Sequence, residues 1–149
     1  MSDHHAAQEL LGEFGRSTGL GELALDQDNY CALLIDDGLV VNIEFDEQDR
    51  QLVLYSLLGV PAGEPQAAYE RLLQANYLGR ECGGATFGLR PDNSVVLSQS
   101  MAVAGLDLKD FTARLERFIN EVEAWTKQLP QLGAASEAAP AEEFPVIRG

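Results

Sequence analysis

The 149-residue sequence contains few of the residues on which most catalytic and metal sites depend. It has two cysteines, two histidines and one tryptophan. Cys31 and Cys82 lie far apart and form no Cys-x-x-Cys motif, which argues against a zinc knuckle or a disulfide framework. The acidic group Asp46-Glu47-Asp49 lacks the ligand spacing, the glycine and the distal Glu of an EF-hand loop. We therefore expect two reduced, structural thiols, no metal site and no cofactor.

The sequence also lacks the usual components of nucleophilic catalysis. A serine or cysteine nucleophile needs a positioned base, and the two histidines, His4 and His5, lie in the irregular start expected before the first helix. Asp36 and Asp37 are adjacent, and neighbouring strand residues point to opposite faces, so they do not suit an acid and base pair. The sequence predicts no catalytic residue; a small enzyme that uses Cys82 or an acidic pair is the alternative from another class.

Positive charge is scarce, which restricts the possible partners. The chain has 10 Lys and Arg residues against 24 Asp and Glu residues, and its formal net charge is −14. Nucleic-acid binding depends on clustered Lys and Arg, and a strongly negative protein is repelled by phosphates and anionic lipid. The start resembles no signal peptide, and no apolar run approaches the roughly 18 residues of a membrane span. We expect a cytoplasmic protein that binds neither nucleic acid nor membrane and that attracts basic or poorly folded proteins.

Hydrophobic periodicity predicts a single α+β domain over residues 1–129. Apolar residues recur at helical spacing over residues 6–18, 65–78 and 108–125, with Gly19 as a stop and Asp107 as an N-cap. Five apolar runs predict strands over residues 30–36, 39–46, 51–58, 85–90 and 94–101. The expected order is helix, three antiparallel strands, helix, two strands, helix, which excludes a Rossmann fold.

Two segments have more apolar surface than one small core requires. In residues 51–58, Val53, Tyr55 and Leu57 form a second apolar face opposite Leu52 and Leu54, and this face needs a cover. The helix over residues 65–78 is apolar around more than one stripe, which predicts contact with its own sheet and with another subunit.

The last twenty residues, 130–149, differ in composition from the rest. They are rich in Ala, Pro and Glu and show no sustained apolar period, so that burial cannot offset the entropy of ordering them. We expect a flexible tail, in which the short Phe144-Pro145-Val146-Ile147 patch is either a docking peptide or simply a part of the disordered end.

Three segments are similar to a known family: Leu72-Leu73-Gln74-Ala75-Asn76-Tyr77-Leu78, Gly83-Gly84-Ala85-Thr86-Phe87-Gly88-Leu89 and Ser94-Val95-Val96-Leu97. Their order, followed by a long C-terminal helix, resembles the Tir-chaperone (CesT) family of class I type III secretion chaperones. Upstream, Leu11-x-x-Phe14, Gly19-Leu20 and Leu23-x-Leu25 resemble the start of that family. The resemblance spans roughly residues 7–129 and implies a secretion-chaperone-like two-layer sandwich that forms a homodimer.

The resemblance implies a non-enzymatic chaperone that binds the N-terminal segment of a secreted effector and keeps it soluble and secretion-competent. The second helix and the following strand would form the dimer interface, with Ala68, Tyr69, Leu72, Leu73, Asn76, Tyr77 and Phe87. The first helix and the first three strands would bind the effector, with Leu10, Leu11, Phe14, Tyr30, Leu33, Val53, Tyr55 and Leu57. Each of these residues also suits an ordinary core.

Two further points follow from the resemblance. Components of the secretion apparatus would be additional partners, because they would perform the release of the effector. A regulator of type III secretion gene expression that exchanges one protein partner for another has the same fold, and it is the alternative function.

Overall fold

The computed structural model describes residues 2–134. The main elements follow the predicted order: α1 (Asp3–Thr18), β1 (Tyr30–Ile35), β2 (Leu39–Asp46), β3 (Gln51–Gly59), α2 (Pro65–Asn76), β4 (Thr86–Leu89), β5 (Val95–Ala102) and α3 (Leu108–Gln128). Short 3-10 turns follow β1, α2 and α3, at Asp36–Gly38, Tyr77–Gly79 and Leu129–Gln131. The predicted α+β arrangement is confirmed, whereas the homodimer remains a prediction.

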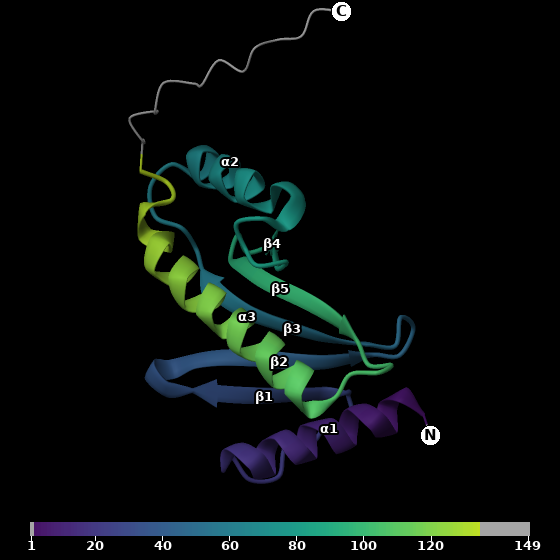
Figure 1. Cartoon of the computed structure of the whole chain (residues 1–149). Helices are drawn as coiled ribbons and strands as arrows, with labels where there is room; N and C mark the ends of the chain where they lie inside the picture. Colours follow the sequence, from purple (N-terminus) through teal and green to yellow (C-terminus); the bar gives the residue numbers. More distant parts are fainter. Residues whose placement is uncertain (1, 135–149) are drawn as a thin grey trace, which may run out of the picture.

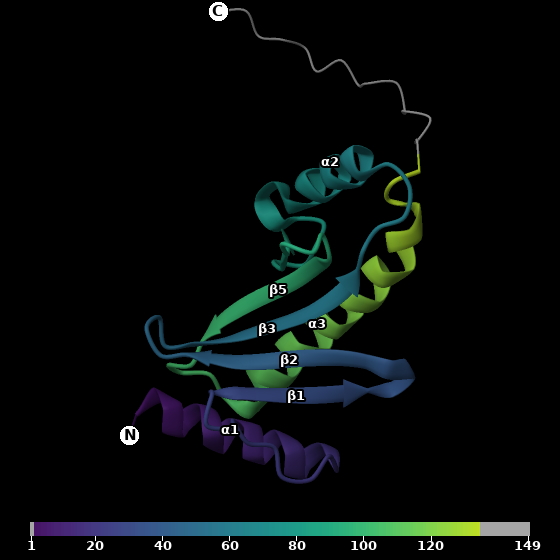
Figure 2. The same cartoon turned by 180° about the vertical axis from the view of Figure 1, so that it is seen from behind.

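The five strands form one antiparallel sheet in the order β1-β2-β3-β5-β4. Figures 1 and 2 show that α3 crosses one face of this sheet obliquely and that α1 lies along its β1 edge. The remaining helix, α2, lies at the opposite end of the molecule, beside β4. The predicted two layers are therefore the sheet and the helices on one of its faces.

The hydrophobic core lies between the sheet and the helices α1 and α3. Alternate residues of β2 and β3, such as Ile43 and Leu54, are fully buried on this face. Phe111 of α3 packs edge to face against Phe14 of α1, with ring centroids 5.3 Å apart, and so joins the two helices. Complete burial of a Leu or Phe side chain stabilises a fold by roughly 1.5–3 kcal/mol, so this layer provides most of the stability.

The local signals for the ends of α1 and α3 act as predicted. Gly19 adopts a φ of 75° at the C-terminus of α1, a left-handed conformation that suits glycine. Asp107 caps α3, because its side chain accepts a hydrogen bond of 2.8 Å from the backbone N–H of Asp110.

The start of α1 was predicted wrongly, since the helix begins at Asp3 and includes His4 and His5. Ser2 caps it by accepting a hydrogen bond of 3.1 Å from the backbone N–H of His5. His4 is hydrogen-bonded to Asn29 at 3.0 Å and packs edge-on against Phe45. Contacts with residues distant in sequence thus extend the helix beyond its apolar repeat.

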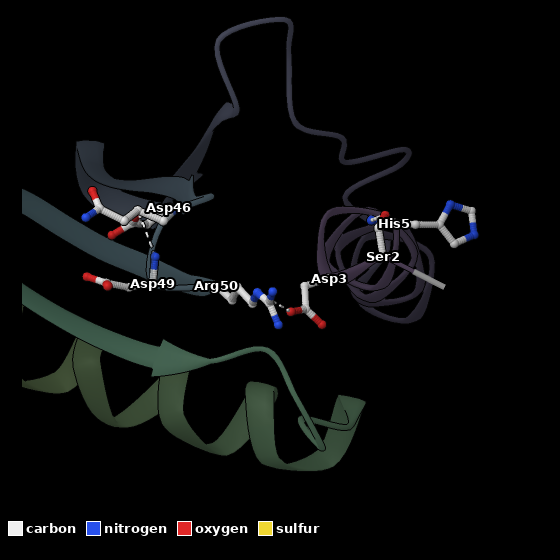
Figure 3. Close-up of polar contacts among 7 residues, drawn as sticks. Ser2, Asp3, His5, Asp46, Asp49 and Arg50 are labelled. Carbon is white, nitrogen blue, oxygen red and sulfur yellow. Dashed lines mark hydrogen bonds and ion pairs between the residues drawn. The ribbon is translucent and has the colours of Figure 1, made fainter.

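A surface ion pair also attaches this first turn to the sheet. Figure 3 shows the Arg50 side chain reaching from the turn between β2 and β3 to Asp3, with 3.7 Å between Nε and Oδ2. Arg50 is mostly exposed, so solvent screening keeps the contribution of this pair to stability small.

The ordered domain extends past the residue at which the sequence places its end. Leu132 is buried, and Gly133 pairs with Gly63 in an isolated parallel bridge, its carbonyl accepting a 2.9 Å hydrogen bond from the N–H of Glu64. Residues 130–134 therefore pack against the loop that leads into α2. The rest of the expected tail, residues 135–149 with the Phe144–Ile147 patch, lies outside the described residues.

Candidate functional site

One end of the molecule has a largely apolar surface formed by α2, the turn that follows it and β4. We call it the α2 surface and define it by Tyr69, Leu73, Asn76, Tyr77, Leu78, Phe87 and Leu89. Leu73 and Tyr77 are each 70% exposed, and Leu78 and Leu89 are also exposed. A small cavity of about 240 Å³ opens between α2 and β4, beside Leu73 and Phe87. Large apolar side chains gathered in this way on a surface make it a candidate site for contact with another protein.

The α2 surface is held in place by polar contacts around its rim. Arg71 makes a two-pronged hydrogen bond with Glu81, at 2.9 and 3.1 Å, and its guanidinium lies 5.2 Å from the centre of the Trp125 ring. The Trp125 ring in turn packs edge to face against Phe87, with 4.8 Å between the centroids. Because the carboxylate of Glu81 favours the charged guanidinium, the pKa of Arg71 is raised, and that of Glu81 is lowered by the same hydrogen bond.

The predicted dimer residues fall into two groups in the structure. Ala68 and Leu72 are buried within the protomer and hold α2 on the domain. The other five, Tyr69, Leu73, Asn76, Tyr77 and Phe87, are partly or largely exposed on the α2 surface. The sequence analysis missed Leu78 and Leu89. Leu78 was assigned to the last turn of a longer helix, but α2 ends at Asn76 and Leu78 adopts a φ of 57° in the following turn.

A second apolar surface is the sheet face turned away from α1 and α3, which we call the open face. Leu34 of β1 lies opposite Val40 of β2, and Leu57 of β3 lies opposite Val96 of β5. Leu34 is 70% exposed, and Val40 and Leu57 are also exposed. The sequence predicted a cover for this face, and among the described residues no helix provides it.

A row of polar side chains lies beside these apolar residues on the open face. The hydroxyl of Tyr30 donates to Asn42 Oδ1, and Asn42 Nδ2 donates to the carbonyl of Tyr55 at 3.2 Å. The hydroxyl of Tyr55 donates to the carboxylate of Glu44 at 2.9 Å. Burial and the hydrogen bond to Glu44 both favour the neutral phenol, and they raise the pKa of Tyr55 to about 12. These hydrogen bonds give both the oxygen and the nitrogen of the buried Asn42 amide a partner.

The predicted effector-binding residues do not lie on one surface. Leu10, Leu11, Phe14 and Leu33 are buried in the core, on the helix-covered side of the sheet. Tyr30, Val53, Tyr55 and Leu57 lie together on the open face. Leu34, Val40 and Val96 complete that face. They were missed because strand periodicity shows which residues share a face without showing which face another element covers.

The two edge strands of the sheet, β4 and β1, differ in whether their outward backbone groups are hydrogen-bonded. At the β4 edge, Phe87 is hydrogen-bonded to Asn76 of α2. At the β1 edge, Tyr30 is bonded to Asp26 through both its N–H and its carbonyl. The outward backbone groups of Ala32 and Leu34 have no partner among the described residues. An added strand can pair with β1 at these two residues.

The cysteines are free and buried, as predicted. Burial and the nearby carboxylates of Glu121 and Glu81 raise the pKa of Cys82 to about 11, and burial also raises the pKa of Cys31. A thiolate nucleophile is therefore disfavoured at both positions. In residues 2–134, no cluster of three His, Cys, Asp or Glu side chains is placed to hold a metal ion, and no helix is long and apolar enough to cross a membrane.

Solved structures share this architecture. A chain of the ExsC–ExsE complex superposes with a TM-score of 0.74 and 24% identity over 87% of this chain and 98% of its own. A chain of the HopA1–SchA chaperone–effector complex superposes with a TM-score of 0.68 and 22% identity. The match covers 85% of this chain and 94% of that chain. The structure of the Yersinia pestis type III secretion chaperone SycH, in complex with a fragment of YscM2, gives a TM-score of 0.64 and 20% identity. That match covers 78% of this chain and 97% of the other chain. The fold is thus that of the type III secretion chaperones.

The sequence places the chain within this class. Residues 9–126 match the model of the Tir chaperone protein (CesT) family, and the chain belongs to that family. A Chlamydia pneumoniae protein is 28% identical over 125 residues, which cover 82% of this chain and 95% of that protein. The resemblance found in the sequence is therefore confirmed, and the protein is a type III secretion chaperone of the CesT family.

Proposed function

We propose that this chaperone acts in the cytoplasm as a non-enzymatic homodimer that binds the N-terminal segment of a secreted effector and keeps it soluble and secretion-competent. The observation that carries the proposal is the apolar surface left outside a closed core. The α2 surface and the open face lie at different places on the molecule, and residues such as Leu57 and Leu73 expose 48% and 70% of their surface. We assign these two apolar areas to two different partners, a second subunit and an effector.

The α2 surface suits the contact between subunits. In a two-fold dimer the same patch of each copy meets its counterpart. Leu73 and Tyr77 are exposed beside the cavity between α2 and β4, so an apolar side chain from the second copy can enter that cavity. Ala68 and Leu72 support the helix from below. The proposed interface accordingly lacks Ala68 and Leu72 of the predicted one, and it gains Leu78 and Leu89.

The β1 edge suits an extended segment of the effector. Outward backbone groups of Ala32 and Leu34 supply hydrogen bonds, while side chains of the added strand contact the neighbouring apolar surface. The net charge of −14 favours a basic or neutral segment. The HopA1–SchA structure, a chaperone–effector complex of the same fold, supports an effector as partner. Components of the secretion apparatus would then release the effector from the chaperone.

Comparison of the proteins secreted by a gene-deletion strain and its parent tests this function. The deletion should remove one or a few effectors from the culture medium and leave the others unchanged. Complementation with Ala32→Pro, which removes one outward N–H of β1, should restore secretion poorly, whereas Ala32→Val keeps the donor and should restore it fully. Mass spectrometry of the medium provides the measurement.

Two other outcomes would contradict the proposal. Normal secretion of every effector, together with altered transcription of the secretion genes, would identify the protein as a partner-switching regulator. Equal complementation by Ala32→Pro and Ala32→Val would exclude the β1 edge as the place where the effector binds.

A further inference from the structure

The cavity of the α2 surface matches an apolar run in the chain's own C-terminal segment. Among the described residues, Leu73 and Tyr77 beside this cavity are each 70% exposed. The cavity, of about 240 Å³, is lined mainly by apolar and aromatic side chains, among them Tyr69 and Phe87. Beyond residue 134 the sequence contains Phe144-Pro145-Val146-Ile147, which we call the tail patch. A phenyl ring that enters such a cavity gains both burial and aromatic contact.

The last described residue lies close enough for the tail patch to reach this cavity. Ala134 lines a groove of about 290 Å³ together with Ala67 of α2, whereas Tyr69 of α2 lines the cavity. Residues two positions apart lie on nearly opposite sides of a helix, so the groove and the cavity flank α2. Half the circumference of a helix is roughly 17 Å, and a ten-residue chain such as that from Ala134 to Phe144 spans up to roughly 33 Å. The length of the intervening chain is sufficient.

Charge favours the α2 surface over the other apolar area of the molecule. Residues 135–149 contain three glutamates and one arginine, and Glu142 and Glu143 directly precede the tail patch. Residues 64–90, which carry the α2 surface, contain three arginines and three glutamates. Residues 1–63, which carry β1 to β3, contain 12 acidic residues and two arginines. The open face and the β1 edge therefore repel an acidic segment more strongly than the α2 surface does.

The tail patch suits a contact made through side chains and not through strand pairing. Asn76 already bonds the backbone N–H and carbonyl of Phe87, which closes the β4 edge next to the cavity. Pro145 has no N–H to donate to a sheet, and its fixed φ favours an extended conformation. The Phe144 ring can therefore enter the cavity while the backbone of the tail patch stays hydrated.

We infer that the tail patch binds the α2 surface of its own chain, with the Phe144 ring in the cavity, and competes there with the second subunit. The inference rests on the proposed function, because it takes the α2 surface as the contact between subunits. Both copies must release their tail patches before they associate. A tail patch that is bound three-quarters of the time in each monomer weakens the dimer about sixteenfold. The segment thus sets the concentration at which the chaperone dimerises.

Analytical ultracentrifugation of the full-length protein tests the competition. Phe144→Ser should lower the dissociation constant of the dimer about tenfold, because the tail patch no longer covers the surface that the second subunit needs. Ala138→Ser, in the same segment but outside the tail patch, is the matched control and should dimerise like the native protein. Equal dissociation constants of the two variants would overturn the inference. A weaker dimer in Phe144→Ser would also overturn it, since the tail patch would then belong to the subunit contact.

A synthetic peptide locates the contact. The probe is a fluorescent peptide of residues 140–148, and its binding to full-length Phe144→Ser protein is followed by anisotropy. Addition of Leu73→Asp to this protein should weaken binding about tenfold or more. Leu20→Asp introduces the same charge in the loop after α1, at a residue that is 48% exposed, and should leave binding unchanged. Loss of binding with Leu57→Asp instead would place the tail patch on the open face and overturn the inference.

The two measurements separate this inference from the proposed function. If no variant dimerises while the peptide binds and Leu73→Asp abolishes its binding, the subunit contact is wrong and the tail patch is the occupant of the α2 surface. If the dimer forms and the peptide does not bind, the tail contact is wrong and the dimer stands.

Discussion

Asn76 and Phe87 exchange two hydrogen bonds that close the β4 edge of the sheet. The backbone N–H of Phe87 donates to Asn76 Oδ1 at 2.7 Å, and Asn76 Nδ2 donates to the carbonyl of Phe87 at 3.1 Å. The amide side chain thus imitates one residue of a neighbouring strand. It joins the end of α2 to β4, and it leaves β1 as the more open edge.

Replacement of Asn76 by Ala should destabilise the protein by about 1–3 kcal/mol, because two backbone groups of Phe87 lose their partner in a half-buried position. Urea unfolding followed by circular dichroism measures the change. Gln74→Ala, at an exposed position of the same helix, should have almost no effect. Equal stabilities of the two variants would show that the double hydrogen bond contributes little.

If the proposed dimer forms through the α2 surface, Leu73→Asp should convert it to monomers at micromolar concentration, since a carboxylate would have to be buried in the proposed apolar contact between subunits. The fold should persist, with stability within about 0.5 kcal/mol, because Leu73 is 70% exposed in the protomer. Multi-angle light scattering measures the mass. Leu20→Asp should stay dimeric, and a monomeric native protein would refute the interface.

Gly133→Ala should separate the end of the domain from the loop before α2. A Cβ at Gly133 would lie 2.2 Å from the carbonyl oxygen of Ala62 and 2.8 Å from the N–H nitrogen of Glu64, so backbone has to move. We expect a loss of about 1–3 kcal/mol. Gly88→Ala is the control, because a Cβ there meets no atom within 4 Å. Faster hydrogen exchange at the start of α2 in Gly133→Ala alone would confirm the link.

The stability that Tyr55 provides should decline in alkali. Its pKa is raised to about 12 from an ordinary value of 10, so the unfolded chain loses this proton first. The contribution is complete below pH 10 and falls as the pH rises through 12. Tyr55→Phe should remove the last step of the ultraviolet phenolate titration, whereas Tyr77→Phe should retain it. Persistence of that step in Tyr55→Phe would assign it to another tyrosine.

Most of the fold could be predicted because its elements depend on local patterns. The alternation of Val41, Ile43 and Phe45 and the helical repeat through Phe111 and Leu115 identify strand and helix without knowledge of their neighbours. The predictions failed at the ends of elements. His4 joins α1 through Asn29 and Phe45, and α2 ends where Asn76 meets Phe87. Such contacts link residues that are far apart in sequence.

The binding surfaces were predicted less completely. Leu10 and Leu57 are the same residue type. Leu10 is nevertheless buried in the core on the helix-covered side of the sheet, and Leu57 is exposed on the open face. Leu72 and Leu73 are neighbours on one helix, and only Leu73 is exposed. Apolarity alone does not separate residues that hold the domain together from residues that remain for a partner.

The sequence by itself determined the elements, their order, the strong negative charge and the reduced structural thiols, because these depend on composition and on short-range periodicity. It also indicated the CesT family, through the resemblance of a few segments and their order to that family. The tertiary structure decided which apolar residues stay exposed and which backbone groups stay unpaired. Exposure depends on what packs against each face: α1 and α3 cover one side of the sheet, and among the described residues no helix covers the other. The open face, the α2 surface and the β1 edge are therefore properties of the assembled domain.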